Sequence, residues 1–220
     1  MMNQATFDLM VINQTPNPLH GLKARVRVIN MDGSVVSDKT TPVSAHPSCA
    51  TNLGAIEFPA NLSSVHFVKT ELHDAQGRLL SDNFYWRGLS ANDLTSLNGL
   101  PPANVEGNIR RHDAAGKCLL DVTLSNPSKV VALMTHIQLR KQTSNERVLP
   151  VYYDDNYVSL LPGDSRTIQV EAASKDLGGD NPLIVVDGWN PVVQSRSFSG
   201  GVSIAPNTPA LVTGAPAAKL

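Results

Sequence analysis

Short runs in which apolar and polar residues alternate recur along the whole chain. In residues 22–30, LKARVRVIN, apolar side chains occupy the even positions up to 28, and basic side chains occupy 23, 25 and 27. Residues 6–13 and 65–74 alternate in a similar way. A period of two residues is typical of a β-strand with one buried face. Helical periodicity is not sustained over about 11 residues anywhere, so the pattern predicts an all-β protein.

Turn-forming residues separate these runs. The segments 31–33 (MDG), 75–78 (AQGR) and 162–164 (PGD) each lie between two strand-like runs. Pro fixes φ, Gly permits unusual backbone conformations, and Asp can accept a hydrogen bond from its own backbone. Strand signals return about every 8–12 residues, which is typical of β-sandwiches. We therefore expect two consecutive immunoglobulin-like β-sandwich domains, each with about six or seven strands.

The alternation pauses at residues 89–102, LSANDLTSLNGLPP. Ser90 with Asp93 three residues later indicates a helix N-terminus, and Gly99 followed by two prolines indicates its end. We expect one helical turn that links a first domain, 1–95, to a second, 96–198. Residues 199–220 are rich in Gly, Ala and Pro, and we expect a flexible tail. The alternative for this tail is a strand docked on a neighbour.

Composition narrows the class of protein. The chain has 220 residues, 41% of them hydrophobic, which is enough for one large core or two small ones. A net charge of −1 favours neither nucleic acid nor an anionic membrane, and no apolar run approaches the length of a membrane span. The N-terminus lacks the features of a signal peptide, which leaves secretion to depend on any longer parent protein. The two cysteines, Cys49 and Cys118, fit no compact zinc spacing, so we expect unpaired thiols and no metal or cofactor.

The most unusual local segment is residues 152–158, YYDDNYV. Aromatic rings with neighbouring acids and an amide could bind a sugar or contact a partner domain, while Ca²⁺ would need more oxygen ligands. The alternative is a corner between strands in which tyrosines pack and acids stabilise turns. Trp189, near the end of the second domain, could stack on a sugar ring, or it could close the end of the sandwich core. The candidate contact residues are Tyr152, Tyr153, Asp154, Asp155, Asn156, Tyr157 and Trp189.

No residue is a strong candidate for catalysis. The carboxylates lie in turns or on outer faces of expected strands, and no triad, P-loop, GxGxxG or HExxH motif is present.

Three elements in order resemble one enzyme family. They are Asn83, Tyr85 and Trp86 as N-x-Y-W, residues 155–164 as D-N-x-V-S-L-x-P-G-D, and residues 188–190 as G-W-N. Over residues 5 to about 192, the chain resembles the C-terminal part of glycoside hydrolase family 2, in the branch of exo-β-D-glucosaminidases and β-mannosidase-like enzymes. In that branch, a catalytic (β/α)8 barrel is followed by two β-sandwich domains.

The resemblance implies a non-catalytic accessory region that braces the barrel of an exo-glycosidase acting on β-mannosides or β-glucosaminides. The barrel and its catalytic glutamates have no counterpart here, so no activity is expected from this chain alone. Its implied partners are the barrel and N-terminal domains of the parent hydrolase. The alternatives are a stand-alone carbohydrate-binding module for β-linked oligosaccharides and an adhesion-type sandwich pair. The resemblance also implies that the first domain lacks an edge strand, which leaves an unpaired β-ladder.

Overall fold

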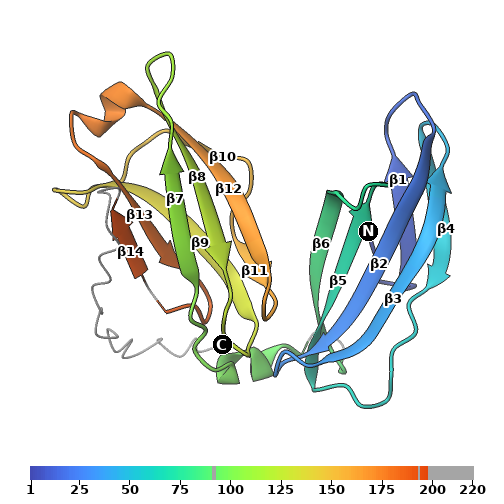
Figure 1. Cartoon of the computed structure of the whole chain (residues 1–220). Helices are drawn as coiled ribbons and strands as arrows, with labels where there is room; N and C mark the ends of the chain where they lie inside the picture. The colour runs from blue at the N-terminus through green and yellow to red at the C-terminus, as the bar shows by residue number, and fades with distance from the viewer. Residues whose placement is uncertain (91–92, 193, 198–220) are drawn as a thin grey trace, which may run out of the picture. The chain divides into compact units, whose positions relative to one another are not determined.

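The computed structural model describes residues 1–90, 93–192 and 194–197 (Figure 1). It divides into two compact units, Met1–Pro101 (unit 1) and Pro102–Leu220 (unit 2). Both units are built from strands, and the protein is all-β with two consecutive immunoglobulin-like sandwiches. The predicted boundary at residues 95 and 96 falls inside a short 3₁₀ helix, whereas the units divide between Pro101 and Pro102. The predicted tail, 199–220, lies outside the described residues.

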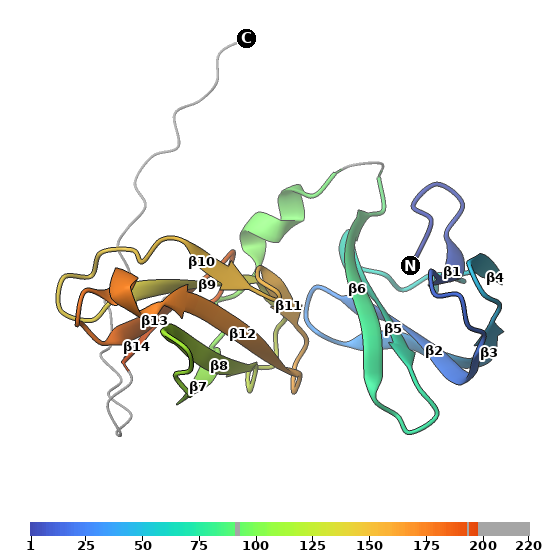
Figure 2. The same cartoon turned by 90° about the horizontal axis from the view of Figure 1, so that it is seen from above.

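Unit 1 pairs a four-stranded sheet with a two-stranded one (Figures 1 and 2). The larger sheet has the order β3-β2-β5-β6, and the smaller sheet is β1-β4, all antiparallel. The strands are β1 (Asp8–Asn13), β2 (Leu19–Asn30), β3 (Val35–Ala45), β4 (Cys49–Ala55), β5 (Val65–His73) and β6 (Leu79–Gly88).

The alternation predicted for residues 22–30 is confirmed in β2. Its even-numbered apolar side chains are buried, and Leu22, Ala24 and Val26 belong to the core of unit 1, while its arginines lie on the opposite face. There Arg25 pairs with Asp38 at 2.6 Å, and Arg27 pairs with Glu71 at 3.1 Å. The core consists of Met2, Leu9, Val11, Leu22, Ala24, Val26, Val43, Ala45 and Val68.

The predicted hairpin turn between β5 and β6 is organised by Asp74. Its carboxylate accepts hydrogen bonds from the backbone N–H groups of Gln76 (3.0 Å) and Arg78 (2.8 Å). Gly77 has a φ of 82°, a left-handed value that glycine adopts without steric cost. The turn chemistry in the sequence therefore fixes the register of this hairpin.

The helical turn predicted in residues 89–102 is present as the 3₁₀ helix η1 (Thr95–Gly99), but the predicted N-cap is wrong. Ser90 does not cap the helix, because η1 begins five residues later. Asp93 instead accepts hydrogen bonds from the backbone N–H and the hydroxyl of Thr95, at 3.1 and 2.6 Å.

Unit 2 is a sandwich of two four-stranded sheets, β10-β12-β8-β7 and β11-β9-β13-β14 (Figures 1 and 2). Its strands are β7 (Glu106–Arg111), β8 (Lys117–Ser125), β9 (Ala132–Lys141), β10 (Val151–Tyr153), β11 (Val158–Leu160), β12 (Ser165–Ala173), β13 (Pro182–Asp187) and β14 (Gln194–Ser197), with a 3₁₀ helix η2 (Ser174–Leu177) after β12. Its core includes Ala103, Val105, Leu120, Val122, Leu124, Ile137, Leu139, Ile168, Val170 and Ile184.

The two units repeat one plan. In each, a buried asparagine lies at the end of a strand: Asn13 is the last residue of β1, and Asn126 directly follows β8. The next strand begins six residues later, at Leu19 or Ala132. The Asn13 Nδ2 donates to the Ala45 carbonyl, and the Asn126 Nδ2 donates to the Leu160 carbonyl. The sheet β3-β2-β5-β6 then corresponds to β11-β9-β13-β14, and the pair β1-β4 corresponds to β8-β12.

Among the described residues, no helix is long and apolar enough to cross a membrane. No group of three or more His, Cys, Asp or Glu in the described ranges could hold a metal ion. Cys49 is exposed and Cys118 is buried, and both are free thiols.

Candidate contact surface around Tyr157

The structure separates the three tyrosines of the candidate segment. Tyr152 on β10 pairs with Glu171 of β12 and is 67% exposed on the outer face of that sheet. Tyr153 packs against the core, and its hydroxyl accepts a hydrogen bond from the Leu139 N–H at 3.2 Å. Burial raises the pKa of Tyr153. Tyr157 precedes β11 in the other sheet and is 55% exposed.

Both acids of the segment hold strands together. Asp154 accepts a hydrogen bond from the Gln169 N–H at 2.7 Å and donates its own N–H to the Gln169 carbonyl at 3.1 Å. Asp155 forms a 2.5 Å ion pair with Arg166 and accepts the Asn156 N–H at 2.8 Å. These carboxylates stabilise the corner where the chain passes from one sheet to the other.

Asn156 attaches this corner to β9. Its Oδ1 accepts the Ile137 N–H at 2.9 Å, and its Nδ2 donates to the Ile137 carbonyl at 3.0 Å. The Asn156 side chain therefore pairs with the backbone of Ile137 in β9 as the backbone of a neighbouring strand would. Its Oδ1 also accepts the N–H of Tyr157, which has a left-handed φ of 56°. A non-glycine residue with this φ costs about 1 kcal/mol or more, so the surrounding contacts must hold it.

Tyr157 stacks on a histidine at the start of a polar row on β9. The rings of Tyr157 and His136 lie 4.3 Å apart with an interplanar angle of 12°. The carboxylate of Asp187 bonds to His136 Nδ1 at 2.7 Å and accepts the Gln138 Nε2 at 2.7 Å. Arg140 donates to the Gln138 Oε1 at 2.9 Å. We call Tyr157, His136, Asp187, Gln138 and Arg140 the β9 surface.

The segment around Trp189 combines structural and exposed residues. A Cβ on Gly188 would lie 2.7 Å from the Met134 carbonyl oxygen, so only glycine fits there without a backbone shift. Asn190 is buried and bonds to the backbone of Leu133 and Val131 at 2.8 Å each. Trp189 is 51% exposed, and its backbone N–H donates to the Leu133 carbonyl at the start of β9. Trp189 is therefore attached to the start of β9, and Tyr157 stacks on the middle of the same strand at His136.

The β9 surface offers an aromatic ring and several hydrogen-bonding groups, a combination suited to binding polar rings or another domain. A His–Asp pair needs a nucleophile within hydrogen-bond reach for covalent catalysis. Among the hydrogen bonds of the described residues, none joins His136 to a serine or cysteine side chain.

Sequence reasoning named Tyr157 and Trp189 but missed His136, Gln138 and Arg140. Their signal was the alternation in residues 134–141, MTHIQLRK, where polar side chains at 136, 138 and 140 share one face. Asp187 could not be placed beside them without the β9–β13 register, which pairs it with His136.

The fold defines this chain as a pair of consecutive immunoglobulin-like β-sandwiches. Residues 5–88 match the mannosidase Ig/CBM-like domain, and residues 83–191 match the exo-β-D-glucosaminidase Ig-fold domain. The chain therefore belongs to the Ig-like domains of the glycoside hydrolase family 2 enzymes.

The relatives are much longer proteins. An exo-β-D-glucosaminidase of Amycolatopsis orientalis is 29% identical over 214 residues, which cover 87% of this chain and 21% of that protein. A mannosylglycoprotein endo-β-mannosidase of Lilium longiflorum is 24% identical over 251 residues, covering 86% of this chain and 26% of that protein. The crystal structure of the A. orientalis exo-chitosanase CsxA matches with a TM-score of 0.83 at 27% identity, covering 90% of this chain and 26% of that one. The chain thus spans about a fifth to a quarter of these relatives.

Proposed function

We propose that this chain is a non-catalytic accessory region of a family 2 exo-glycosidase that acts on β-glucosaminides or β-mannosides, and that it braces the catalytic barrel of that longer enzyme. One observation carries the proposal. The acids of the candidate segment are engaged in strand contacts, Asp154 with Gln169 and Asp155 with Arg166. Glycosidase carboxylates must instead face each other across the scissile bond, about 5–10 Å apart.

The similarities support the same assignment. Both family models describe Ig-like domains, and the relatives named as glucosaminidase and mannosidase are several times longer. In this account, the exposed Tyr157 and Trp189 belong to the face that contacts the rest of the enzyme.

The test is hydrolysis of p-nitrophenyl β-D-glucosaminide and p-nitrophenyl β-D-mannoside by the purified chain. We expect no turnover above the buffer blank, because Asp154 and Asp155 are engaged in strand contacts and do not face each other across a cleft as acid and nucleophile must. Deleting the same residues from the longer enzyme should lower its unfolding temperature. Turnover by the pure chain, or a longer enzyme equally stable without these residues, would contradict the proposal.

Carbohydrate binding is a second candidate function. It is favoured by the Tyr157 ring, which is 55% exposed, held in a left-handed conformation and stacked on His136 beside Asp187. An exposed ring beside hydrogen-bonding groups is suited to a sugar.

A titration with glucosamine and mannose oligosaccharides, followed by NMR, distinguishes the two functions. If the surface binds sugar, amide shifts should centre on β9, and Tyr157→Ala should abolish them. Tyr152→Ala is the matched control, because Tyr152 is at least as exposed as Tyr157 but lies on the other sheet. Unchanged spectra at millimolar sugar would leave domain contact as the role of the β9 surface.

A further inference from the structure

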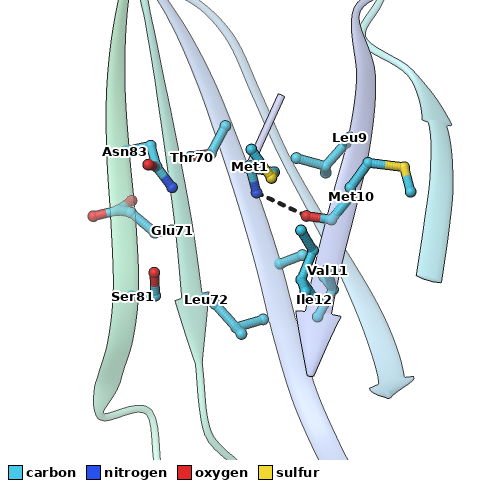
Figure 3. A pocket seen from close by; sticks show the side chains of 11 residues that line it. Met1, Leu9, Met10, Val11, Ile12, Thr70, Glu71, Leu72, Ser81 and Asn83 are labelled. Carbon is cyan, nitrogen blue, oxygen red and sulfur yellow. Dashed lines mark hydrogen bonds between the residues drawn. The ribbon is translucent and has the colours of Figure 1, made fainter. Parts of the chain in front are cut away.

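The face of β6 that points toward the smaller sheet, β1-β4, carries a row of polar side chains. Ser81 and Asn83 line a cavity of about 250 Å³ between the two sheets of unit 1, and Leu9 and other residues of β1 line its opposite side (Figure 3). Tyr85 packs against the core. Because side chains of alternate residues share a face, Arg87 points the same way. The cavity leaves β6 loosely packed against β1, so contacts farther along this row are needed to hold the two sheets together.

Arg87 lies over two aromatic rings that belong to the ends of the smaller sheet. Its guanidinium carbon is 3.9 Å from the ring centroids of both Phe7 and Phe58. The two ring centroids are 5.3 Å apart, with an interplanar angle of 81°. Phe7 comes directly before β1, and Phe58 follows β4. Ring faces attract a cation, so Arg87 ties the end of β6 to the smaller sheet.

A buried histidine lies beside this arginine. His66 pairs with Arg87 across the β5-β6 ladder and is 0% exposed. Its Nε2 lies 3.4 Å from Nη1 of Arg87. A guanidinium can only donate hydrogen bonds, so Nε2 is the acceptor and the neutral ring carries its proton on Nδ1. A second proton on His66 would therefore be added to the nitrogen that faces Arg87. We call Arg87, Phe7, Phe58 and His66 the Arg87 cluster.

Among the described residues, no carboxylate forms an ion pair with the Arg87 cluster, although Asp8 and Glu57 adjoin its phenylalanines in sequence. Asn30, which pairs with His66 from β2, is uncharged. Two positive charges at the separation of His66 and Arg87 repel strongly in a buried site. His66 is fixed on a central strand, whereas Arg87 is partly exposed at the end of an edge strand. Arg87 is therefore the group that moves into water when His66 gains a proton.

The smaller sheet is anchored at the opposite end of β1. Asn13, the last residue of β1, donates to the carbonyls of Ala45 and His46 at 3.3 and 3.1 Å, where β3 ends. At the other end, Phe7 has a left-handed φ of 61°, which is unfavourable for a residue with a side chain. When Arg87 leaves the rings, the Phe7 end can therefore move while the Asn13 end stays in place.

We propose that the Arg87 cluster is an acid-released latch of unit 1. Protonation of His66 displaces Arg87 from the two rings, and the Phe7 end of the smaller sheet then moves away from β6 about the Asn13 anchor. The cavity between the sheets allows this movement, because β1 and β6 are not closely packed there. Burial, and secondly the charge of Arg87, lower the pKa of His66 below 6.5, so the latch is closed at neutral pH. The latch lies wholly within unit 1 and does not depend on the proposed function.

An NMR titration of the whole chain tests the latch. At about pH 7.5, the ring currents of Phe7 and Phe58 should displace the side-chain proton signals of Arg87, and by about pH 5 these signals should return to ordinary positions. The midpoint should equal that of the His66 ring signals and lie below 6.5. The Ile56 N–H, which donates to the Phe7 carbonyl at 3.0 Å, should shift with the same midpoint. Amide signals of the β2-β5 ladder should remain those of the folded state, because the latch opens without unfolding unit 1.

Substitutions separate the latch from a general effect of acid. His66→Gln keeps a hydrogen-bond acceptor for Arg87 but gains no proton, so the Arg87 signals should stay displaced over the whole range. His20→Gln is the matched control, because His20 is exposed on β2, and it should leave the titration unchanged. Arg87→Met removes the charge but keeps an unbranched side chain beside the rings, so the pKa of His66 should rise and the Ile56 signal should no longer follow it.

Several results would overturn the latch. One is an Arg87 side chain that stays on the rings while His66 titrates, and another is a release that coincides with loss of the β2-β5 ladder. A His66→Gln chain that releases Arg87 at the same pH, or a His66 that stays neutral until unit 1 unfolds, would overturn it as well. Hydrolysis by the chain would contradict the proposed function but leave the latch standing, so the two failures are distinguishable.

Discussion

Asparagine side chains secure strand ends in both sandwiches. Asn13 donates to the carbonyls of Asn17, Ala45 and His46, and Asn126 donates to those of Val130 and Leu160. Each of these asparagines also accepts a hydrogen bond from the residue two positions later. A buried carbonyl that loses its donor retains the cost of desolvation. These side chains are therefore part of the framework of the sandwiches.

Replacing Asn126 tests this role. Asn126→Ala should lower the free energy of unfolding of unit 2 by about 2–3 kcal/mol, because the buried carbonyl of Leu160 loses its partner. Urea unfolding measures the change. Asn108→Ala, at an exposed position on β7 of the same unit, should change it by less than about 0.5 kcal/mol. Equal effects of the two substitutions would contradict the framework role.

His66 is a buried titratable residue in unit 1. Its exposed fraction is 0%, and its Nε2 lies 3.4 Å from an Arg87 nitrogen. The Arg87 guanidinium lies 3.9 Å from the ring centroids of both Phe7 and Phe58. Burial, and secondly the charge of Arg87, lower the pKa of His66 below its ordinary value of 6.5.

The lowered pKa predicts that unit 1 loses stability as pH falls. Below about pH 6.5, the unfolded chain binds a proton that folded His66 resists, so the free energy of unfolding should decrease between about pH 7.5 and 5.5. NMR titration should give His66 a pKa below 6.5, and His66→Gln should flatten the pH dependence. A His66 pKa at or above 6.5 would contradict the assignment.

At the level of elements, the passage from β10 to β11 determines where the aromatic residues lie. β10 belongs to one sheet and β11 to the other. Tyr152 therefore faces outward from the first sheet, Tyr153 faces the core, and Tyr157 faces outward from the second. The corner is held by Asp154, Asp155 and Asn156, so the segment serves structure and exposes one ring on each face.

The tight approach of Gly188 to β9 is a second element-level constraint. Gly188→Ala would place a Cβ 2.7 Å from the Met134 carbonyl oxygen, and should cost about 1–3 kcal/mol through a forced backbone shift. Gly107→Ala is the matched control, because its Cβ would meet Leu124 at an ordinary 3.7 Å. Chemical unfolding compares the two variants, and a Gly188→Ala protein as stable as the control would refute the constraint.

The sequence pattern predicts what depends on local chemistry. Alternation in residues 22–30 identifies β2 and its buried face, and the AQGR segment identifies the β5–β6 hairpin. Both features are encoded by neighbouring residues, so no knowledge of the partner strands is needed.

Features that depend on pairing between distant residues could not be predicted in this way. The β9 surface needs the register that places Asp187 beside His136, 51 residues away. The separation of the tyrosines needs the change of sheet after Tyr153. The start of η1 was misplaced because Ser90 and Asp93 both resemble caps, and only the backbone path shows that Asp93 bonds to Thr95.

On the scale of the whole molecule, each unit has a hydrophobic core of its own. We therefore expect residues 102–220, produced alone, to unfold cooperatively with the midpoint that unit 2 shows in the full chain. Amide spectra and thermal unfolding provide the comparison. A disordered fragment, or one with a clearly lower midpoint, would show that the units depend on each other.

We propose that these two sandwiches serve within a much larger hydrolase. The most direct test is the mass of the polypeptide that carries this sequence in the cells that produce it, measured by immunoblot with antibody against the chain. We expect a band several times heavier than 23.6 kDa, because the relatives are several times longer than this chain. A band at 23.6 kDa alone would contradict it and would make the stand-alone carbohydrate-binding module the leading explanation.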